Sequence, residues 1–544
     1  MERGAYFLYD TESRFGVSLR RTAMTVMKKE RATTMHNQRS SGVLLHLTSL
    51  PGPFGIGTLG KSAFEFIDFL RAAGQTNWQI LPYGPVSSIF DNSPYMSLSA
   101  FAGNPLLIDP AQLVGAGLLR REQVEISHDF SEYLVDFAAV LAFKEKILEL
   151  AFLEFRLAGD AAAFADFCQT MDWLDDYALF MALREEFEGA PWFSWPADIA
   201  RRKPEALAQW RKNLAERILF HKFVQFCFFS QWQIFWDYAH SHGVKIIGDI
   251  PIYVALDSAD VWANQECFVL DRETGQPTHV AGVPPDYFSD TGQRWGNPLF
   301  KWHGDGGELN TFLLDWWGQR FCHICQTVDV VRIDHFRGFE AYWQIPASEE
   351  TAINGKWVKG PGLAFFSEMK KHLGELPIIA EDLGVITPEV EQLRDTFGFP
   401  GMKVLQFAFD SDEHNAYLPH NYTTVNCVAY TGTHDNDTTL GWYFSDTVMQ
   451  GSKAKALRYA HSQPGSPVYW DFIRMAYASV AELVIVPLQD VLGFGSDCRM
   501  NVPGTSQGNW RWRCAARFLN DETARTLRDE VLFYNRLPIP PAGS

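Results

Sequence analysis

The chain has 544 residues, of which 47% are hydrophobic and 21% charged, a composition typical of a globular protein rather than a disordered one. Acidic residues outnumber basic ones by 65 to 47, which gives a formal net charge of −18. This balance argues against a nucleic-acid partner, because phosphate binding needs a basic face. No apolar run approaches the roughly 18 residues that a membrane span needs, so we expect no membrane partner.

Residues 1–39 differ in character from the rest of the chain. They mix basic and acidic residues and contain Met24, Met27 and Met35. We predict a disordered N-terminal extension, or a start codon assigned too early. A plastid transit peptide fits poorly, because such peptides avoid acidic residues. The eight scattered cysteines suit a reducing compartment, and we therefore expect a cytoplasmic location.

Eight β-rich runs begin at residue 42, with helical patterns between them. Near-continuous apolar strands that alternate with helices are typical of a buried parallel sheet. Eight of them predict an α/β fold, a (β/α)₈ TIM barrel. An open, doubly wound sheet is the alternative, but the glycines after the first run do not match its phosphate-binding spacing. The runs are 42–47, 78–83, 244–250, 328–336, 377–383, 402–409, 426–435 and 482–489.

The spacing of these runs predicts two insertions into a catalytic barrel of residues 40–544. The gap after the second run far exceeds one crossover helix, and its periodicity predicts a mainly helical subdomain over about 106–225. The stretch after the third run, about 252–312, is rich in Gly, Pro and Asp and predicts loops. Cys322 and Cys325 lie in an amphipathic pattern without a second cysteine pair, so we interpret them as thiols on a helix, with no metal.

Acidic residues end several of the predicted strands, where barrel enzymes place their chemistry. Asp249 ends the third run, Asp334 the fourth, Glu381 the fifth and Asp435 the seventh. Clustered carboxylates repel one another, so a purely stabilising role is a weak explanation. Coordination of a metal such as Mg²⁺ and glycosyl chemistry are the two obvious uses.

Glycosyl chemistry is the better of the two uses. A Mg²⁺ site would be expected beside phosphate-binding loops, which the sequence lacks. Glycosyl transfer needs two carboxyl groups that flank the bond. Arg332 lies two residues before Asp334 and shares its face of the strand, so it can keep that carboxylate ionised. The plain alternative is that Arg332 and Asp334 form an ordinary ion pair.

The chain from about residue 40 onward resembles the 4-α-glucanotransferases of glycoside hydrolase family 77, also called amylomaltases or disproportionating enzymes. The resemblance extends through segments that span the predicted strands, in order. These segments are SGVLLHLTSLPGPFGIGTLG (41–60), WQILPYGP (78–85), SPYMSLSAFAGNP (93–105), GDIPIYV (248–254), GVPPDYFSDTGQRWGNP (282–298), VRIDHFRGF (331–339), IIAEDLG (378–384), THDND (433–437) and MNVPGTSQGNW (500–510).

The resemblance implies roles for individual residues. Asp334 would be the nucleophile, Glu381 the general acid/base, and Asp435 a third acid that holds hydroxyls of the distorted sugar. Segment 282–290 matches a mobile loop over the groove, and Trp295 an aromatic residue near the acceptor. The other positions that match substrate-binding residues of the family are Tyr95, Asp249, Arg332, His434, Tyr287, Phe288 and, less closely, Asn501.

The resemblance also implies the reaction and its partners. The expected activity is retaining transfer of an α-1,4-glucan segment to the 4-hydroxyl of another glucan or of glucose, with maltooligosaccharides as substrates and no cofactor. A hydrolase of the α-amylase kind would use the same acids and is the nearest alternative. A glucan-binding regulator without catalysis is the alternative from another class, which the intact Asp334, Glu381 and Asp435 disfavour. The sequence predicts no oligomeric state.

Overall fold

A computed structural model of the chain describes residues 39–126, 128–285, 289–304 and 306–537. The predicted N-terminal extension, 1–39, lies outside these ranges except for Arg39. Tyr287 and Phe288 also lie outside the described residues. Within the described residues, no helix is both long enough and apolar enough to cross a membrane.

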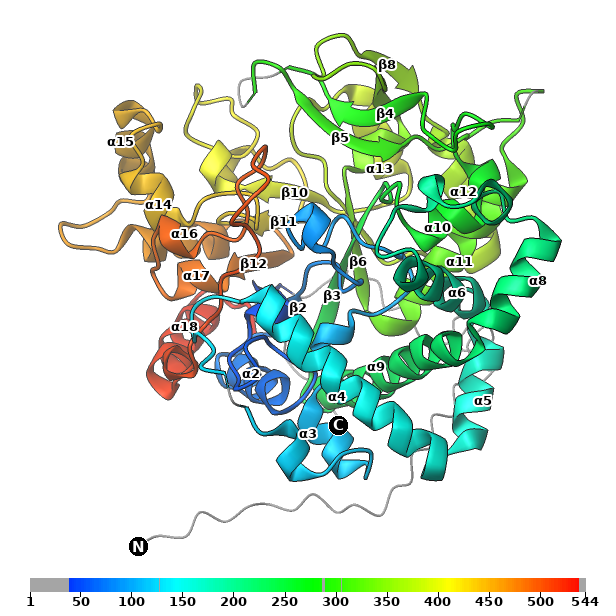
Figure 1. Ribbon diagram of the computed structural model, residues 1–544. Coiled ribbons are helices and arrows are strands. Elements are labelled where there is room, and N and C mark those ends of the chain that lie inside the picture. The colour runs from blue at the N-terminus through cyan, green and yellow to red at the C-terminus, as the bar shows by residue number, and fades with distance from the viewer. Residues whose placement is uncertain (1–38, 127, 286–288, 305, 538–544) are drawn as a thin grey trace, which may run out of the picture.

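Eight parallel strands form a closed barrel (Figure 1), which confirms the predicted (β/α)₈ fold and excludes the open sheet. Neighbouring strands follow the order of the chain, and the ring closes where β1 pairs with β12. Each of the eight predicted runs contains the whole of a barrel strand or most of it. The barrel strands are β1 (Ser40–Leu44), β2 (Asn77–Gln79), β3 (Lys245–Pro251), β6 (Val330–Asp334), β9 (Ile378–Ala380), β10 (Gly401–Val404), β11 (Cys427–Tyr430) and β12 (Leu483–Pro487).

The barrel strands are apolar because both of their faces are buried. Every residue of β9, β11 and β12 is buried, so these strands show continuous apolar runs instead of alternation. Gly42 of β1 shows how closely the strands pack. A Cβ atom added there would lie 2.4 Å from the Asn77 carbonyl oxygen and 2.8 Å from Cδ1 of Ile485, so the position requires glycine.

Helices surround the barrel (Figure 1). Several of them belong to the stretch of chain that connects β2 to β3. In that stretch Asp136 caps α4 by accepting from the Ala139 N–H, and α9 ends just before Gly243, whose φ is 73°. The division of this stretch from the barrel as a subdomain stays a prediction. The helices are α2 (Lys61–Ala72), α3 (Pro110–Gly115), α4 (Phe137–Ala158), α5 (Ala161–Thr170), α6 (Leu174–Glu186), α7 (Ala197–Ala200), α8 (Pro204–Asn213), α9 (Ala215–Ser241), α10 (Ala259–Ala263), α11 (Thr311–Thr327), α12 (Gly362–Leu373), α13 (Pro388–Thr396), α14 (Thr439–Phe444), α15 (Gln450–Tyr459), α16 (Val468–Ala478), α17 (Leu488–Val491) and α18 (Asp521–Phe533).

A second, antiparallel sheet lies beside the barrel, in the order β5-β4-β7-β8 (Figure 1). Its strands are β4 (His279–Val283), β5 (Gln293–Pro298), β7 (Ala341–Pro346) and β8 (Lys356–Lys359). The stretch after β3 was expected to consist of loops, yet it supplies β4 and β5. Both are short, Gly and Pro interrupt them, and β4 pairs with β7, which lies some way further along the chain. The local sequence pattern therefore does not predict these two strands.

The base of the barrel is held by two arginines. Arg536, which is fully buried after α18, donates to the carbonyl oxygens of Ser40 (3.2 Å) and Ala481 (3.0 Å), next to β1 and β12. Arg39 donates to the Ser479 carbonyl oxygen at 2.7 Å. These contacts join the two ends of the described chain. Elsewhere, Cys322 and Cys325 are free thiols on α11, as predicted.

Candidate active site

Three of the predicted residues meet where β3 and β6 end. The register pairs Asp249 with Arg332, and Arg332 Nη1 contacts both oxygens of Asp249, at 2.8 and 2.7 Å. Arg332 Nη2 lies 3.0 Å from Oδ1 of Asp334, two residues further on. Arg332 is only 3% exposed, so the guanidinium is a buried cation held between two carboxylates.

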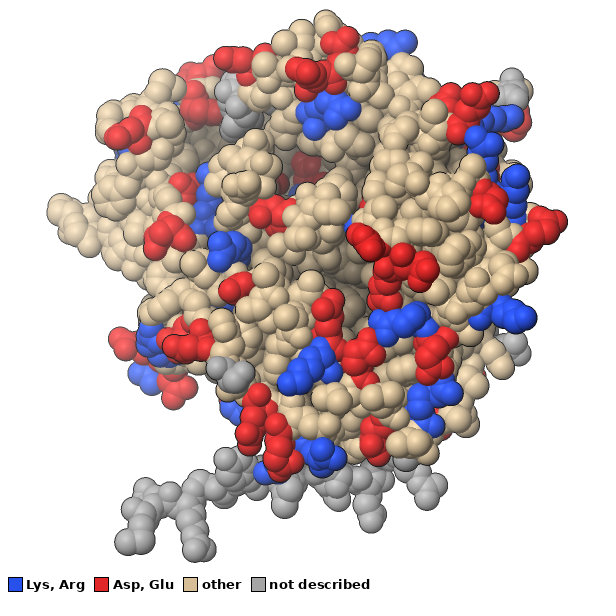
Figure 2. Space-filling model, in the orientation of Figure 1, with Lys and Arg blue, Asp and Glu red and all other residues tan. Residues whose placement is uncertain are grey.

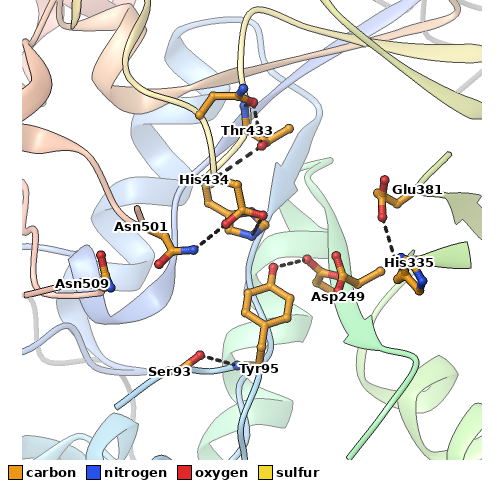
Figure 3. Close-up of polar contacts among 12 residues, drawn as sticks. Ser93, Tyr95, Asp249, His335, Glu381, Thr433, His434, Asn501 and Asn509 are labelled. Carbon is orange, nitrogen blue, oxygen red and sulfur yellow. Dashed lines mark hydrogen bonds and ion pairs between the residues drawn. The ribbon is translucent and has the colours of Figure 1, made fainter. Parts of the chain in front are cut away.

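Glu381 lies beside Asp334 because β6 and β9 are neighbours. Ile333 pairs with Ala380, so the residue that follows each of them emerges at the same edge of the barrel. Two main-chain N–H groups donate to the Glu381 carboxylate at 2.7 Å, Leu383 to Oε1 and His335 to Oε2. The His335 N–H that donates to Glu381 (Figure 3) belongs to a residue with a left-handed backbone, φ 55°.

Tyr95 reaches the same site from the loop after β2. Its hydroxyl donates to Oδ2 of Asp249 at 2.7 Å (Figure 3). Its ring stacks on that of His434, with the centroids 5.0 Å apart and the planes 16° apart. Trp510 also packs against both rings, with centroid distances of 5.7 Å to Tyr95 and 5.9 Å to His434. The sequence motifs had included Trp510, but they gave it no role.

Asp435 is held by groups from two loops. His434 Nε2 lies 3.3 Å from its carboxylate, and the Asn501 amide donates to Oδ1 at 2.6 Å (Figure 3). Arg499 donates to the main-chain carbonyl of Asp435 at 2.6 Å. Asn501 thus contacts the third acid directly, while Arg499, just before the matched segment 500–510, was missed.

The two central acids have environments that resist ionisation. Burial raises the pKa of Glu381, and the neighbouring Asp334 raises it further. Burial also raises the pKa of Asp334, but the Arg332 guanidinium partly offsets this. Of the two, Glu381 is therefore the group that keeps its proton to higher pH, and Asp334 the group that loses it first.

Asp435 behaves in the opposite way. Burial alone would raise its pKa, but His434 and the Asn501 amide hold the pKa below the usual carboxyl range. Burial would lower the pKa of His434, yet Asp435 raises it above its usual value. Asp435 therefore presents a negative charge to the site, and this charge favours the protonated form of His434.

Trp295 lies close to the acid pair. It belongs to β5, and its ring meets the His335 ring edge-on with the centroids 4.8 Å apart. Tyr253, from the loop after β3, lies 6.4 Å from Trp295 between centroids. The structure thus brings Tyr95, Asp249, Arg332, Trp295, Asp334, Glu381, His434, Asp435 and Asn501 to one end of the barrel.

The face that carries these residues is hollowed, with acidic side chains inside the hollow (Figure 2). On the same face, Lys and Arg are scattered among acidic residues and form no continuous basic patch (Figure 2). Among the described residues there is no cluster of three or more His, Cys, Asp or Glu side chains suited to hold a metal ion. Within the site, Arg332 contacts Asp249 and Asp334, and His434 contacts Asp435.

A closed (β/α)₈ barrel with two neighbouring carboxyl groups of different proton affinity at its rim fits the class of enzymes that cleave or transfer glycosidic bonds. Within that class, the chain belongs to the family described as 4-alpha-glucanotransferase, whose pattern it matches over residues 45–519. It is 53% identical to the 4-alpha-glucanotransferase of Synechocystis sp. over 90% of this chain and 96% of that protein. The identity to the Thermus thermophilus 4-alpha-glucanotransferase is 49%, over 91% and 98% of the two chains.

A solved structure shows the same arrangement of the chain. The amylomaltase from Streptococcus agalactiae, in complex with acarbose, superposes with a TM-score of 0.86 at 41% identity. The match covers 92% of this chain and 100% of that one. The barrel and its additions are therefore those of the family.

Proposed function

We propose that this protein is a 4-α-glucanotransferase that cleaves an α-1,4 glucosidic bond and passes the glucanyl segment to the 4-hydroxyl of another glucan or of glucose. The observation that carries the proposal is the pair formed by Asp334 and Glu381. They end neighbouring strands, and their surroundings set their proton affinities apart. A retaining double displacement needs this combination of one nucleophilic carboxylate and one acid that is protonated beforehand.

The reaction proceeds in two displacements. Asp334 attacks the anomeric carbon, while Glu381 gives its proton to the leaving 4-hydroxyl oxygen, and a covalent glucanyl–Asp334 ester forms. Glu381 then takes the proton of the acceptor 4-hydroxyl, whose oxygen attacks the anomeric carbon and releases Asp334. Arg332, 3.0 Å from Asp334, favours the ionised carboxylate at the start and end of this cycle.

The other residues bind the sugar chain in this proposal. Asp435, with its fixed charge, accepts hydrogen bonds from hydroxyls of the distorted sugar, and His434 and Asn501 hold it in place. Tyr95 and Asp249, joined by their hydrogen bond, line the same subsite. Trp295, next to His335, offers an aromatic face on the acceptor side.

The remaining proposals concern partners and location. We assign maltooligosaccharides and longer α-1,4-glucans as substrates, with glucose as an acceptor and no cofactor. Arg332 is already held between Asp249 and Asp334, and the hollowed face carries no continuous basic patch (Figure 2), which supports a neutral ligand over an anionic one. The eight cysteines are free thiols, which supports a reducing compartment such as the cytoplasm.

Incubation with maltotriose tests the reaction. Transfer produces a ladder of shorter and longer glucans and leaves the number of reducing ends constant, whereas hydrolysis by an amylase-like enzyme raises that number. A constant count together with glucose release supports the proposal. A rising count would assign the protein to hydrolysis, and no products at all would indicate a glucan-binding protein.

The segment 282–290 is proposed to exclude water from the covalent intermediate. Its Pro284 and Pro285 limit the backbone, and Tyr287 and Phe288 supply aromatic rings that can lie on a sugar chain. Transfer competes with water only where the groove excludes water and holds the acceptor. Replacing Tyr287 and Phe288 together with Ala should raise the ratio of hydrolysis to transfer. An unchanged ratio in a folded variant would contradict this role.

A further inference from the structure

A buried arginine connects the segment of the nucleophile to the loop of the general acid. Arg337 lies in the 3₁₀ helix Phe336–Phe339, which begins two residues after Asp334, and it is 6% exposed. Its Nη1 donates to the carbonyl oxygen of Val385. Its guanidinium lies over the ring of Trp357 in β8, 3.9 Å from the ring centroid. Arg337 therefore bridges the barrel, the loop after β9 and the second sheet.

The loop after β9, residues 381–387, supplies the donor of one of the two main-chain hydrogen bonds that Glu381 accepts. The Leu383 N–H, only two residues along, donates to Oε1. Gly384 follows with φ of 82°, and Val385 is 57% exposed, so packing of the Val385 side chain does little to fix this turn. The hydrogen bond from Arg337 to the Val385 carbonyl oxygen fixes this turn two residues after Leu383.

We propose that Arg337 is a positioning residue for the general acid, because it holds residues 383–385 where the Leu383 N–H can donate to Glu381. This inference rests on the proposed role of Glu381. Arg337 itself contacts neither acid, and a cation–π contact with Trp357 helps to hold its guanidinium in place. The role is distinct from that of Arg332, which contacts the carboxylates directly.

The mechanism predicts a shift of protonation rather than a general loss of function. A hydrogen bond from Leu383 stabilises the ionised form of Glu381, so losing it raises the pKa of Glu381. The other groups that face Glu381 are the charges of Asp334 and Arg332 and the N–H of His335. Because the first displacement needs protonated Glu381, kcat/KM falls as pH rises through that pKa. Loss of the Arg337 bond should therefore move the alkaline limb of kcat/KM to higher pH.

The test compares Arg337→Met with Lys359→Met in the full chain. Lys359, in β8, is a neighbouring cation that is largely exposed, and it pairs with Glu340 without touching the loop. The measurement is kcat/KM for glucose release from maltotriose across pH. We expect the alkaline limb of Arg337→Met to move up by about one pH unit, the equivalent of one lost hydrogen bond to a charged group. Lys359→Met should leave the limb in place.

Two further variants keep the inference open to refutation. Arg337→Lys keeps the charge but loses the planar fork, so its limb should shift less than that of Arg337→Met. If Arg337→Met does not fold, Trp357→Leu, which removes the ring under the guanidinium and keeps Arg337 itself, should shift the alkaline limb in the same direction by a smaller amount. An unmoved limb in the folded Arg337 variant, or an equal shift in Lys359→Met, would overturn the inference. Failure of the proposed function would appear separately, as full activity of Glu381→Gln.

Discussion

The amide of Asn501 offers a direct test of how Asp435 is held. In the structure its Nδ2 donates to Oδ1 of Asp435 at 2.6 Å, and His434 contacts the same carboxylate. The change Asn501→Ala removes this donor and leaves the carboxylate with His434 alone. We expect slower transfer in a protein that remains folded, because Asn501 lies in a loop and is only partly buried.

The size of the effect follows from the charge of the acceptor. A hydrogen bond to a charged group contributes about 1.5–3 kcal/mol. If the transition state needs Asp435 in place, kcat/KM should fall by roughly 10- to 150-fold. The pKa of Asp435 should rise by about one to two units, since the lost bond favoured the ionised form.

The pH dependence separates this effect from a change at the acid pair. His434 and Asn501 hold the pKa of Asp435 below the carboxyl range, while burial raises that of Asp334. The acid limb of kcat/KM reports the higher of these two pKa values, which is that of Asp334. The acid limb should therefore not move in Asn501→Ala. The loss should therefore be nearly uniform across pH. The assay is glucose release from maltotriose, with kcat/KM measured from pH 4 to 9, in steps of about half a unit, to define both limbs.

Two variants serve as controls. Asn501→Asp keeps the size of the side chain but places a second carboxylate against Asp435, so it should be less active than Asn501→Ala at neutral pH. Asn426→Ala removes an amide at the opposite end of β11, where it donates to the Gly398 carbonyl at 3.0 Å, and should retain activity. Activity of Asn501→Ala within twofold of wild type would refute the reasoning, because Asp435 would then not depend on this bond.

Three other variants test separate parts of the molecule. Asp334→Asn should lower turnover by at least about 10³-fold with unchanged thermal unfolding, because the amide cannot form the covalent intermediate; activity above a tenth of wild type would mean that another acid is the nucleophile. Burial lowers the pKa of Lys144 to about 7, so the folded state gains stability as pH rises between that value and the unfolded one. Urea unfolding should show that Lys144→Met is more stable than wild type at pH 7, with the difference shrinking by about 2 kcal/mol by pH 9; a constant difference would mean that Lys144 does not titrate there. A chain that begins at Met35 should fold and stay active, since it keeps Arg39 on Ser479, and loss of solubility or activity would contradict this.

The barrel could be predicted from the sequence because its strands are buried on both faces. Runs such as VKIIGDI and ELVIVPLQ have no polar alternation, and helical patterns separate them, so both the type of sheet and the number of strands could be read. Strands β4 and β5 lacked this signal. Both contain glycine, and most of β5 is partly exposed. β5 pairs with β4, and β4 pairs with the distant β7, a pairing that no local pattern reveals.

The acidic residues of the site could be predicted from the sequence, but the groups that position them could not. Asp334 is the last residue of β6 and Glu381 directly follows β9, so the rule that barrel enzymes place their chemistry at the carboxyl ends of strands puts both at one rim. Nothing in the sequence indicates that His335 takes a left-handed backbone and donates its N–H to Glu381. Likewise, Arg337 and Arg499 act through main-chain carbonyls, which every residue possesses and which therefore leave no pattern in the sequence.

The pairing of β1 with β12 sets the order in which the molecule can assemble during synthesis. The first barrel strand ends at Leu44, and its partner begins only at Leu483, so the ring cannot close until β12 has been synthesised. Until then, β1 exposes an edge that can pair with another chain. Arg536, which binds carbonyls next to both strands, comes later still. β12 thus completes the ring, and a chain truncated before β12 would keep an open edge prone to aggregation.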